Sequence, residues 1–307
     1  MTVAASGLGR HLLDVDGLTR DDFERIFATA RAMREARAAR RRLDDLRGET
    51  VGLLFYEPST RTRVGFEVAA KALGADVVEV AVGSSSVVKG ESFVDTLQTL
   101  ERLGITILAL RHQAAGAPYL AARVVRCGVL NAGDGAHAHP TQALLDAFTL
   151  IERLGPLEGR KVAIVGDLVH SRVARSNLHA LTTLGASVWL AGPATLTRGF
   201  EAWPGATLAT NLDEALRDAD AVMTLRIQRE RQDGGALASV REYVARWGLT
   251  TDRMRLARPG ALVLHPGPMQ EGVEISAELA ASERSVIREQ VENGVAIRMA
   301  VFSLLAR

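Results

Sequence analysis

The chain has 307 residues, of which 47% are hydrophobic and 24% are charged. A single hydrophobic core rarely grows beyond about 250–300 residues, so this length favours two domains, and the hydrophobic fraction excludes a wholly disordered chain. The 37 basic and 36 acidic side chains give a formal net charge of +1, which argues against a nucleic-acid-binding protein because phosphate backbones select a strongly basic face.

The single cysteine, Cys127, excludes an intramolecular disulfide and a cysteine zinc site, and we interpret it as a small core residue rather than a nucleophile. No apolar run approaches the about 18–20 residues that cross a bilayer, and no signal peptide is apparent at the amino terminus. We therefore expect a soluble cytoplasmic protein that associates with neither membranes nor nucleic acids.

The first half of the chain begins with a predicted helix over 19–41, which Thr19 caps and which ends in an arginine cluster expected to be a solvated face. Strands and helices then alternate. We predict strands over 51–56, 77–80, 105–110 and 124–130, and helices over 62–73, 91–103 and 141–154. Such alternation is typical of crossover units that build a mainly parallel sheet.

The second half restarts the same pattern after the Gly-Pro-Leu-Glu-Gly segment 155–159. Strands are predicted over 161–165, 187–190, 221–225 and 261–264, and helices over 172–184, 213–217 and 286–305. The expected fold is α/β, with two domains joined by helices, each a mainly parallel sheet flanked by helices. We place the first domain at 1–150 and the second at 151–285, with a C-terminal helix, 286–307, returning to the first domain.

The segment from Glu57 to Arg63 lies between a predicted strand and a predicted helix. Ligands of open parallel sheets bind outside the carboxyl ends of the strands, and a helix N-terminus offers unpaired N–H groups to an anion. Three hydroxyls and two guanidinium groups in one turn add directional donors. We favour a phosphate-binding turn here, while a simple serine or threonine cap with solvated arginines is the alternative.

Other polar residues follow predicted strands in the first half. Lys89 lies in a serine-rich loop, Arg111 and His112 end a strand, and His137 and His139 alternate on a turn that enters a helix. Because no third ligand is near the two histidines, we interpret them as separate residues and expect no metal.

In the second half, arginines follow two predicted strands. Arg172 starts a helix, and Arg226, Arg229 and Arg231 follow the strand over 221–225. Two such arginines suit a substrate with two carboxylates, since each guanidinium binds one as a fork. The Gly-Asp segment after the strand over 161–165 lacks the Gly-x-Gly-x-x-Gly fingerprint, so we expect no dinucleotide cofactor.

Taken in order, several motifs resemble the aspartate/ornithine carbamoyltransferase family. These are Phe-Tyr-Glu-Pro-Ser-Thr-Arg-Thr-Arg over 55–63 with Phe66-Glu67, the segment 85–91 with Asp95-Thr96, and His-Pro-Thr-Gln over 139–142 with Leu145-Asp146. The segments 225–231 and 265–268 (His-Pro-Gly-Pro) resemble the aspartate branch, whereas the ornithine branch would carry a Cys-Leu-Pro loop at the latter. The resemblance runs essentially end to end.

The resemblance implies that carbamoyl phosphate and L-aspartate give N-carbamoyl-L-aspartate and phosphate, the committed step of pyrimidine synthesis, without a cofactor. It implies roles for individual residues as follows. Ser59, Thr60, Arg61 and Thr62 would bind the phosphate, and Arg111, His139 and Gln142 the carbamoyl end, with Thr62, Arg111 and His139 donating to its oxygen. Ser85 and Lys89 would reach a neighbouring subunit's site in a homotrimer. Arg172, Arg226 and Gln228, with Lys89, would hold aspartate, and the backbone at Pro266, Gly267 and Pro268 would contact the carbamoyl amine.

One departure from the family pattern follows the 265–268 motif. Relatives usually carry asparagine and arginine where this chain has Gln270 and Glu271, so an acid replaces a base near the expected aspartate site. The alternatives are a transcarbamylase for another amine, such as ornithine, and a non-catalytic scaffold paralogue. A dihydroorotase or a regulatory chain is a further possible partner.

Overall fold

The computed structural model describes residues 9–81, 90–228, 237 and 239–306. The chain divides into two compact units, one formed by residues 1–145 with 292–307 and the other by residues 146–291. The division falls inside helix α5 (Pro140–Leu154), upstream of the segment 155–159 that the sequence favours as a boundary. Most of the final helix, α11 (Ile287–Leu305), belongs to the first unit.

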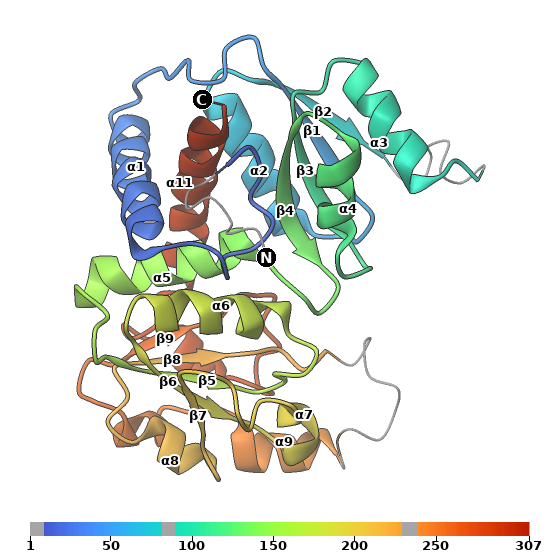
Figure 1. Cartoon of the computed structure of the whole chain (residues 1–307). Coiled ribbons are helices and arrows are strands. Elements are labelled where there is room, and N and C mark those ends of the chain that lie inside the picture. The colour runs from blue at the N-terminus through green and yellow to red at the C-terminus, as the bar shows by residue number, and fades with distance from the viewer. Residues whose placement is uncertain (1–8, 82–89, 229–236, 238, 307) are drawn as a thin grey trace. The chain divides into compact units, whose positions relative to one another are not determined.

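The first unit contains a parallel sheet of four strands in the order β2-β1-β3-β4. The strands are β1 (Thr50–Phe55), β2 (Asp76–Val80), β3 (Ile107–His112) and β4 (Gly128–Asp134). Helices α3 (Phe93–Arg102) and α4 (Ala117–Val124) cover one face of this sheet, and α2 (Thr60–Ala72) with α11 covers the other (Figure 1). Apolar side chains of β1, β3 and β4 pack under α3 and α4 in one buried cluster.

Helix α1 (Arg20–Ala38) starts as the sequence predicts, because Thr19 and Asp22 form a reciprocal capping box. It ends three residues before the predicted 41, where Arg40 takes a left-handed φ of 51°. The prediction of a strand over 124–130 was wrong at its start. Val124 is the last residue of α4, which the sequence analysis did not predict, and the strand begins only at Gly128.

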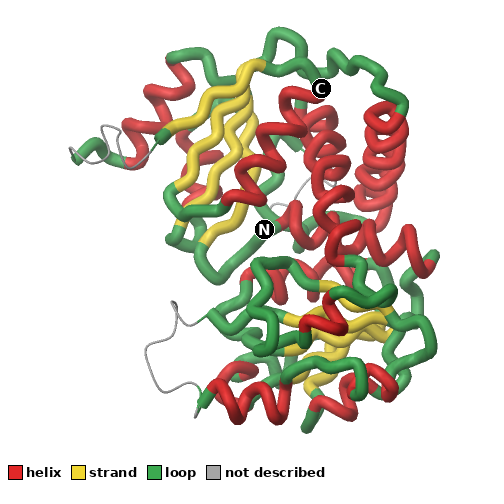
Figure 2. Tube along the Cα trace, turned by 180° about the vertical axis from the view of Figure 1, so that it is seen from behind, coloured by secondary structure: helices red, strands yellow, loops and turns green. Residues whose placement is uncertain are grey.

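The second unit contains a parallel sheet of five strands in the order β7-β6-β5-β8-β9. They are β5 (Lys161–Val165), β6 (Ser187–Ala191), β7 (Ala206–Leu208), β8 (Ala221–Thr224) and β9 (Leu262–Leu264). Helix α6 (Arg172–Thr183) lies over one face, and α8 (Leu212–Leu216) and α9 (Val240–Trp247) lie over the other (Figures 1 and 2). The short elements α7 (Ala194–Thr197), η4 (Arg253–Leu256) and α10 (Ala277–Ala280) complete the unit, and these, with β7 and α9, were not predicted.

Each sheet has one topological switch point, where the chain order reverses. In the first unit it lies between β1 and β3, and in the second between β5 and β8. At such a point the two connecting loops run to opposite faces of the sheet and leave a crevice outside the strands' carboxyl ends. The strand order therefore marks the loops after β1, β3, β5 and β8 as the places for ligands. No helix in the described part of the chain has the length and apolar character to cross a membrane.

Candidate active site

The loop after β1 delivers Ser59 to the N-terminus of α2. Ser59 occupies the capping position with extended backbone (φ −163°, ψ 95°), yet its side chain accepts no hydrogen bond from the helix. The Ser59 side chain therefore does not cap α2, which was the alternative interpretation of this residue. Thr60 and Arg61 are exposed in the first turn, while Thr62 is buried. Hydroxyls and first-turn N–H groups together form an anion-binding arrangement.

Arg111 approaches the same switch point from the neighbouring strand. It is the register partner of Phe55, so the carboxyl ends of β1 and β3 lie side by side there. The side chain is 9% exposed, and its Nη2 donates to Glu57 Oε1 at 2.7 Å while Nη1 donates to the Ala132 carbonyl at 3.3 Å. A buried cation needs such a partner, and Glu57 supplies it.

His139 and Gln142 enter from the start of α5, and both side chains are buried. The His139 carbonyl accepts N–H bonds from Gln142 at 3.0 Å and Ala143 at 3.2 Å, which makes it the first acceptor of the helix. The structure thus places Arg111, His139 and Gln142, all buried, in the same unit as the turn 57–63, for which the sequence predicts phosphate binding.

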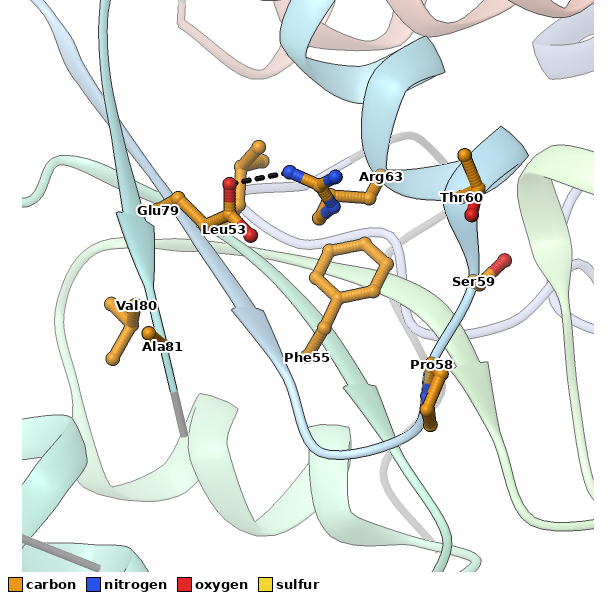
Figure 3. Close-up of a pocket in the computed structure, with 9 residues that line it drawn as sticks. All are labelled: Leu53, Phe55, Pro58, Ser59, Thr60, Arg63, Glu79, Val80 and Ala81. Atoms are coloured by element: carbon orange, nitrogen blue, oxygen red, sulfur yellow. Dashed lines mark hydrogen bonds and ion pairs between the residues drawn. The ribbon is translucent and has the colours of Figure 1, made fainter. Parts of the chain in front are cut away.

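A pocket of about 230 Å³ lies beside the turn 57–63, at the carboxyl ends of β1 and β2 (Figure 3). Ser59 and Thr60 line it, and so does an ion pair between Arg63 and Glu79. The two guanidinium groups of the turn therefore differ in role. Arg63 is engaged by Glu79, whereas Arg61 does not line this pocket and stands exposed.

Two histidines near the site have structural partners. The His112 ring packs against Tyr56 and Phe93, and its Nδ1 accepts the Ala114 N–H at 2.9 Å. Burial lowers the pKa of His112 below its ordinary value, so the ring is neutral at pH 7. His137 contacts Asp134 through Nδ1 at 3.1 Å. No group of three or more metal-ligating side chains occurs among the described residues.

At the switch point of the second unit, Asp167 ties the loop after β5 to the loop after β8. Its side chain is fully buried. Oδ1 accepts from the His170 backbone N–H at 3.2 Å and contacts His170 Nδ1 at 2.8 Å, while Oδ2 accepts the Gln228 N–H at 3.1 Å. The carboxylate thereby fixes the backbone that carries Gln228.

The candidate amino-acid ligands follow the same two strands, β5 and β8. Arg172 is buried in the first turn of α6, which follows β5, and Arg226 and Gln228 are half-buried after β8. Arg226 Nη2 and Gln228 Oε1 are 3.4 Å apart, so the structure brings these two side chains together. Two guanidinium groups at neighbouring strand ends match the expected recognition of two carboxylates.

The loop after β9 contains the 265–268 motif. His265 is buried, Pro266 and Gly267 are half-buried, and the Gly267–Pro268 peptide bond is cis. His265 contacts Glu274 and the Gly267 N–H, so this loop too is held by a buried carboxylate.

Four residues singled out from the sequence, Ser85, Lys89, Arg229 and Arg231, lie outside the described residues. Conversely, no role was predicted from the sequence for Glu57, Asp167 or Glu274. A signal existed for Glu57 and Asp167, since an acidic residue directly or soon after a predicted buried strand stands at the ligand-binding edge of a parallel sheet. Glu274 lies too far beyond its strand to carry that signal.

Lys161, one of only three lysines, is structural. Its ammonium group donates to the carbonyls of Glu214 at 2.9 Å and Arg217 at 2.8 Å and lies 3.8 Å from the Trp189 ring centroid. It therefore satisfies the C-terminal end of α8, where cations are favoured.

Two parallel α/β units, each with arginines and buried polar groups at its switch point, define an α/β protein of the class whose ligand sites lie at the carboxyl edges of its sheets. Residues 10–152 match the family model "Aspartate/ornithine carbamoyltransferase, carbamoyl-P binding domain" and residues 158–305 match "Aspartate/ornithine carbamoyltransferase, Asp/Orn binding domain". The chain belongs to the aspartate/ornithine carbamoyltransferase family.

Among its relatives, the aspartate carbamoyltransferase catalytic subunit of a Roseiflexus species is 52% identical, over 97% of this chain and 95% of the relative. The corresponding subunit of Thermus aquaticus is 53% identical, over 95% and 96%. Among solved structures, aspartate transcarbamoylase from Trypanosoma cruzi in complex with N-(phosphonacetyl)-L-aspartic acid has a TM-score of 0.87 at 33% identity, covering 95% of this chain and 94% of that one. Ornithine carbamoyltransferase from Pyrococcus furiosus also has a TM-score of 0.87, at 28% identity and with coverage of 99% and 98%.

Proposed function

We propose that this chain is an aspartate carbamoyltransferase, which converts carbamoyl phosphate and L-aspartate to N-carbamoyl-L-aspartate and phosphate in pyrimidine biosynthesis. The observation that carries the proposal is the pairing of a phosphate turn with buried Arg111 at the switch point of the first unit. The 52–53% identity to relatives that bear this activity in their names supports it.

The carbamoyl phosphate half is assigned to the first unit. Ser59, Thr60 and Arg61 bind the phosphate oxygens through hydroxyl, guanidinium and first-turn N–H groups. Thr62, Arg111 and His139 donate to the carbamoyl oxygen, and Gln142 contacts the carbamoyl nitrogen end. In this assignment Arg111, which the structure pairs with Glu57, also donates to the substrate.

The chemical step is direct attack of the amine on the carbamoyl carbon. A C–N bond forms, and the carbonyl oxygen becomes an oxyanion. The C–O bond to phosphate then breaks, and the departing phosphate takes the amine proton. Donors already aimed at the oxyanion lower the barrier because they need no reorganisation when charge develops. No protein nucleophile is required, which agrees with Cys127, whose pKa is raised to about 11, chiefly by burial.

The acceptor half is assigned to the second unit, where Arg172, Arg226 and Gln228 bind the two carboxylates of aspartate and the backbone at 266–268 contacts the carbamoyl amine. An ornithine side chain is cationic and calls for a carboxylate, whereas the buried Asp167 already accepts backbone N–H groups of His170 and Gln228 and contacts the His170 ring. This charge pattern favours aspartate over ornithine.

The assembly and location belong to the same proposal. We expect a homotrimer in which Ser85 and Lys89 complete a neighbouring subunit's site. We also expect a cytoplasmic location, and the candidates for a further partner are a dihydroorotase and a regulatory chain. These expectations rest on the family resemblance.

The activity is tested by offering the purified chain carbamoyl phosphate with L-aspartate or with L-ornithine and quantifying carbamoylated product. Product with aspartate alone supports the proposal. Product with ornithine overturns the assignment of the acceptor site and leaves the phosphate site standing, while no product with either amine argues for a scaffold.

Sharing of the site between subunits is tested by mixing two inactive variants, Arg61→Ala and Lys89→Ala. If Lys89 serves a neighbouring subunit, dissociated and reassembled mixtures contain some sites with both native residues and regain activity. Mixtures that stay as inactive as the parents would show that each chain uses its own Lys89.

A further inference from the structure

The imidazole of His265 exists in a single tautomer, which its neighbours dictate. The ring is buried, at 2% exposure. Its Nδ1 lies 2.7 Å from the Gly267 backbone nitrogen, and because an N–H group can only donate, Nδ1 must be the unprotonated acceptor. Nε2 therefore carries the proton and donates a hydrogen bond to Glu274 Oε1 at 2.9 Å.

Glu274 holds the far side of the same turn. Oε1 also accepts the Gln270 N–H at 2.6 Å, so one carboxylate oxygen connects the ring of His265 to the backbone four residues before Glu274. The side chain is 1% exposed, and Oε2 accepts no hydrogen bond within the described chain. Together, His265 and Glu274 clamp the segment from Gly267 to Gln270 at both ends.

Gln290 fixes where the turn begins. Its Oε1 accepts the backbone N–H of His265 at 3.0 Å, and its Nε2 donates to Asp146 Oδ1 at 2.7 Å. The other oxygen of Asp146 accepts from Asn177 Nδ2 at 2.9 Å. All of these side chains are at most 3% exposed. The amide has one possible orientation, since the peptide N–H needs an oxygen and the carboxylate needs a donor.

We propose that Gln290 and Glu274 are positioning residues that set the backbone of Pro266–Pro268 to accept hydrogen bonds from the carbamoyl nitrogen, and so select an amide-bearing acyl phosphate. The inference rests on the proposed function and names the groups that act through the loop. A peptide carbonyl accepts from N–H and has nothing to offer a methyl group. Displacing the loop therefore weakens carbamoyl phosphate and leaves acetyl phosphate, which has a methyl in place of the amine, unaffected.

The experiment measures two constants for each variant at saturating L-aspartate: the KM for carbamoyl phosphate and the inhibition constant of acetyl phosphate. Gln290→Ala is expected to raise the KM for carbamoyl phosphate by about tenfold, which corresponds to the loss of roughly one well-placed hydrogen bond. It should change the inhibition constant of acetyl phosphate by less than about twofold. Asn211→Ala is the matched control. It removes the N-cap of α8 in the same unit and so destabilises the protein away from the loop, with neither constant changed.

A second pair of variants keeps the test decisive should Gln290→Ala fail to fold. Glu274→Gln retains an oxygen that accepts from His265 and Gln270. Its amide nitrogen replaces Oε2, which accepts no hydrogen bond in the described chain, so no contact is lost and selectivity should stay near wild type. Glu274→Leu should lose about tenfold in carbamoyl phosphate KM alone. Equal losses in Glu274→Gln and Glu274→Leu, or parallel losses for both acyl phosphates, would overturn the inference.

The proposed function fails separately, if the wild-type chain forms no carbamoyl aspartate. A wild type that is active, together with Gln290→Ala and Glu274→Leu variants that keep the wild-type ratio of the two constants, refutes only the positioning role.

Discussion

Substitution of the buried Asp167 tests most directly how the second unit holds its candidate ligand-binding residues in place. Its two oxygens accept from two backbone N–H groups, those of His170 and Gln228, and contact the His170 ring. In Asp167→Asn, one oxygen becomes an NH₂ group that faces an N–H donor. At least one hydrogen bond to a charged acceptor is lost, which costs about 1.5–3 kcal/mol of unfolding free energy. For a unit of this size that corresponds to a fall in Tm of about 3–12 °C.

The functional consequence should be confined to the amino acid. Gln228 no longer has its backbone held against the loop after β5, so the KM for aspartate should rise by about tenfold, while the KM for carbamoyl phosphate, assigned to the other unit, stays within about twofold. Steady-state kinetics with each substrate varied in turn, alongside thermal unfolding, measures both effects.

Asp220→Asn provides the control for stability. Asp220 is also buried and accepts three N–H groups, from Arg160 at 3.0 Å, Lys161 at 2.9 Å and Arg258 at 3.2 Å, but it precedes β8 and so stands at the amino end of the sheet. It should lower Tm comparably and leave both KM values unchanged. If Asp167→Asn and Asp220→Asn shift the aspartate KM equally, or neither shifts it, then the carboxylate does not position the site.

Three further perturbations test other parts of the structure. Arg61→Ala should remove nearly all activity without lowering Tm, because the side chain is exposed, and near-normal turnover would contradict its phosphate-binding role. Gly65→Ala should destabilise the first unit, because the added Cβ would lie 2.8 Å from Nη1 of the buried Arg298; unfolding in urea should show partial recovery in the double variant Gly65→Ala/Arg298→Met, and no recovery would contradict the clash. Burial raises the pKa of Cys127 to about 11, so its thiolate fraction grows as pH rises toward that value; at pH 8 mass spectrometry should show alkylation about a hundredfold slower in the native protein than in urea, and equal rates would refute the shift.

Most strands were predictable because buried parallel strands appear as short apolar runs bounded by turn residues. The strand over 161–165 was predicted at its observed bounds. The error at 124–130 has a physical origin. Val124 ends a short helix that contains a proline in its first turn, and Val125 follows in extended conformation, so one apolar run contains a helix end and the approach to a strand. Periodicity cannot separate two such short pieces.

The candidate site was only partly predictable, for a different reason. Motifs at strand ends marked Arg111, Arg172 and Arg226 because a parallel sheet gathers its carboxyl ends at one edge. Their partners depend on strand order, which the sequence does not encode locally. Arg111 meets Glu57 because β3 lies beside β1, and the bond from Gln290 to Asp146 joins residues 144 positions apart. The contacts that position a site are thus the ones a linear pattern cannot predict.

A common device supports the ligand-binding loops of both units. Asp134, Asp167 and Glu274 are buried carboxylates at the end of β4 and in the loops after β5 and β9, and each accepts backbone N–H groups of its own or a neighbouring loop. Hydrogen bonds to a charged acceptor are roughly twice as strong as neutral ones, so these contacts stabilise the loop conformations that the structure shows. A reaction that uses neither a nucleophile nor a dedicated base depends on holding two charged reactants in the attacking geometry. In the proposed function, loops held in this way provide that geometry, and the arginines beside them are the groups proposed to bind the substrates.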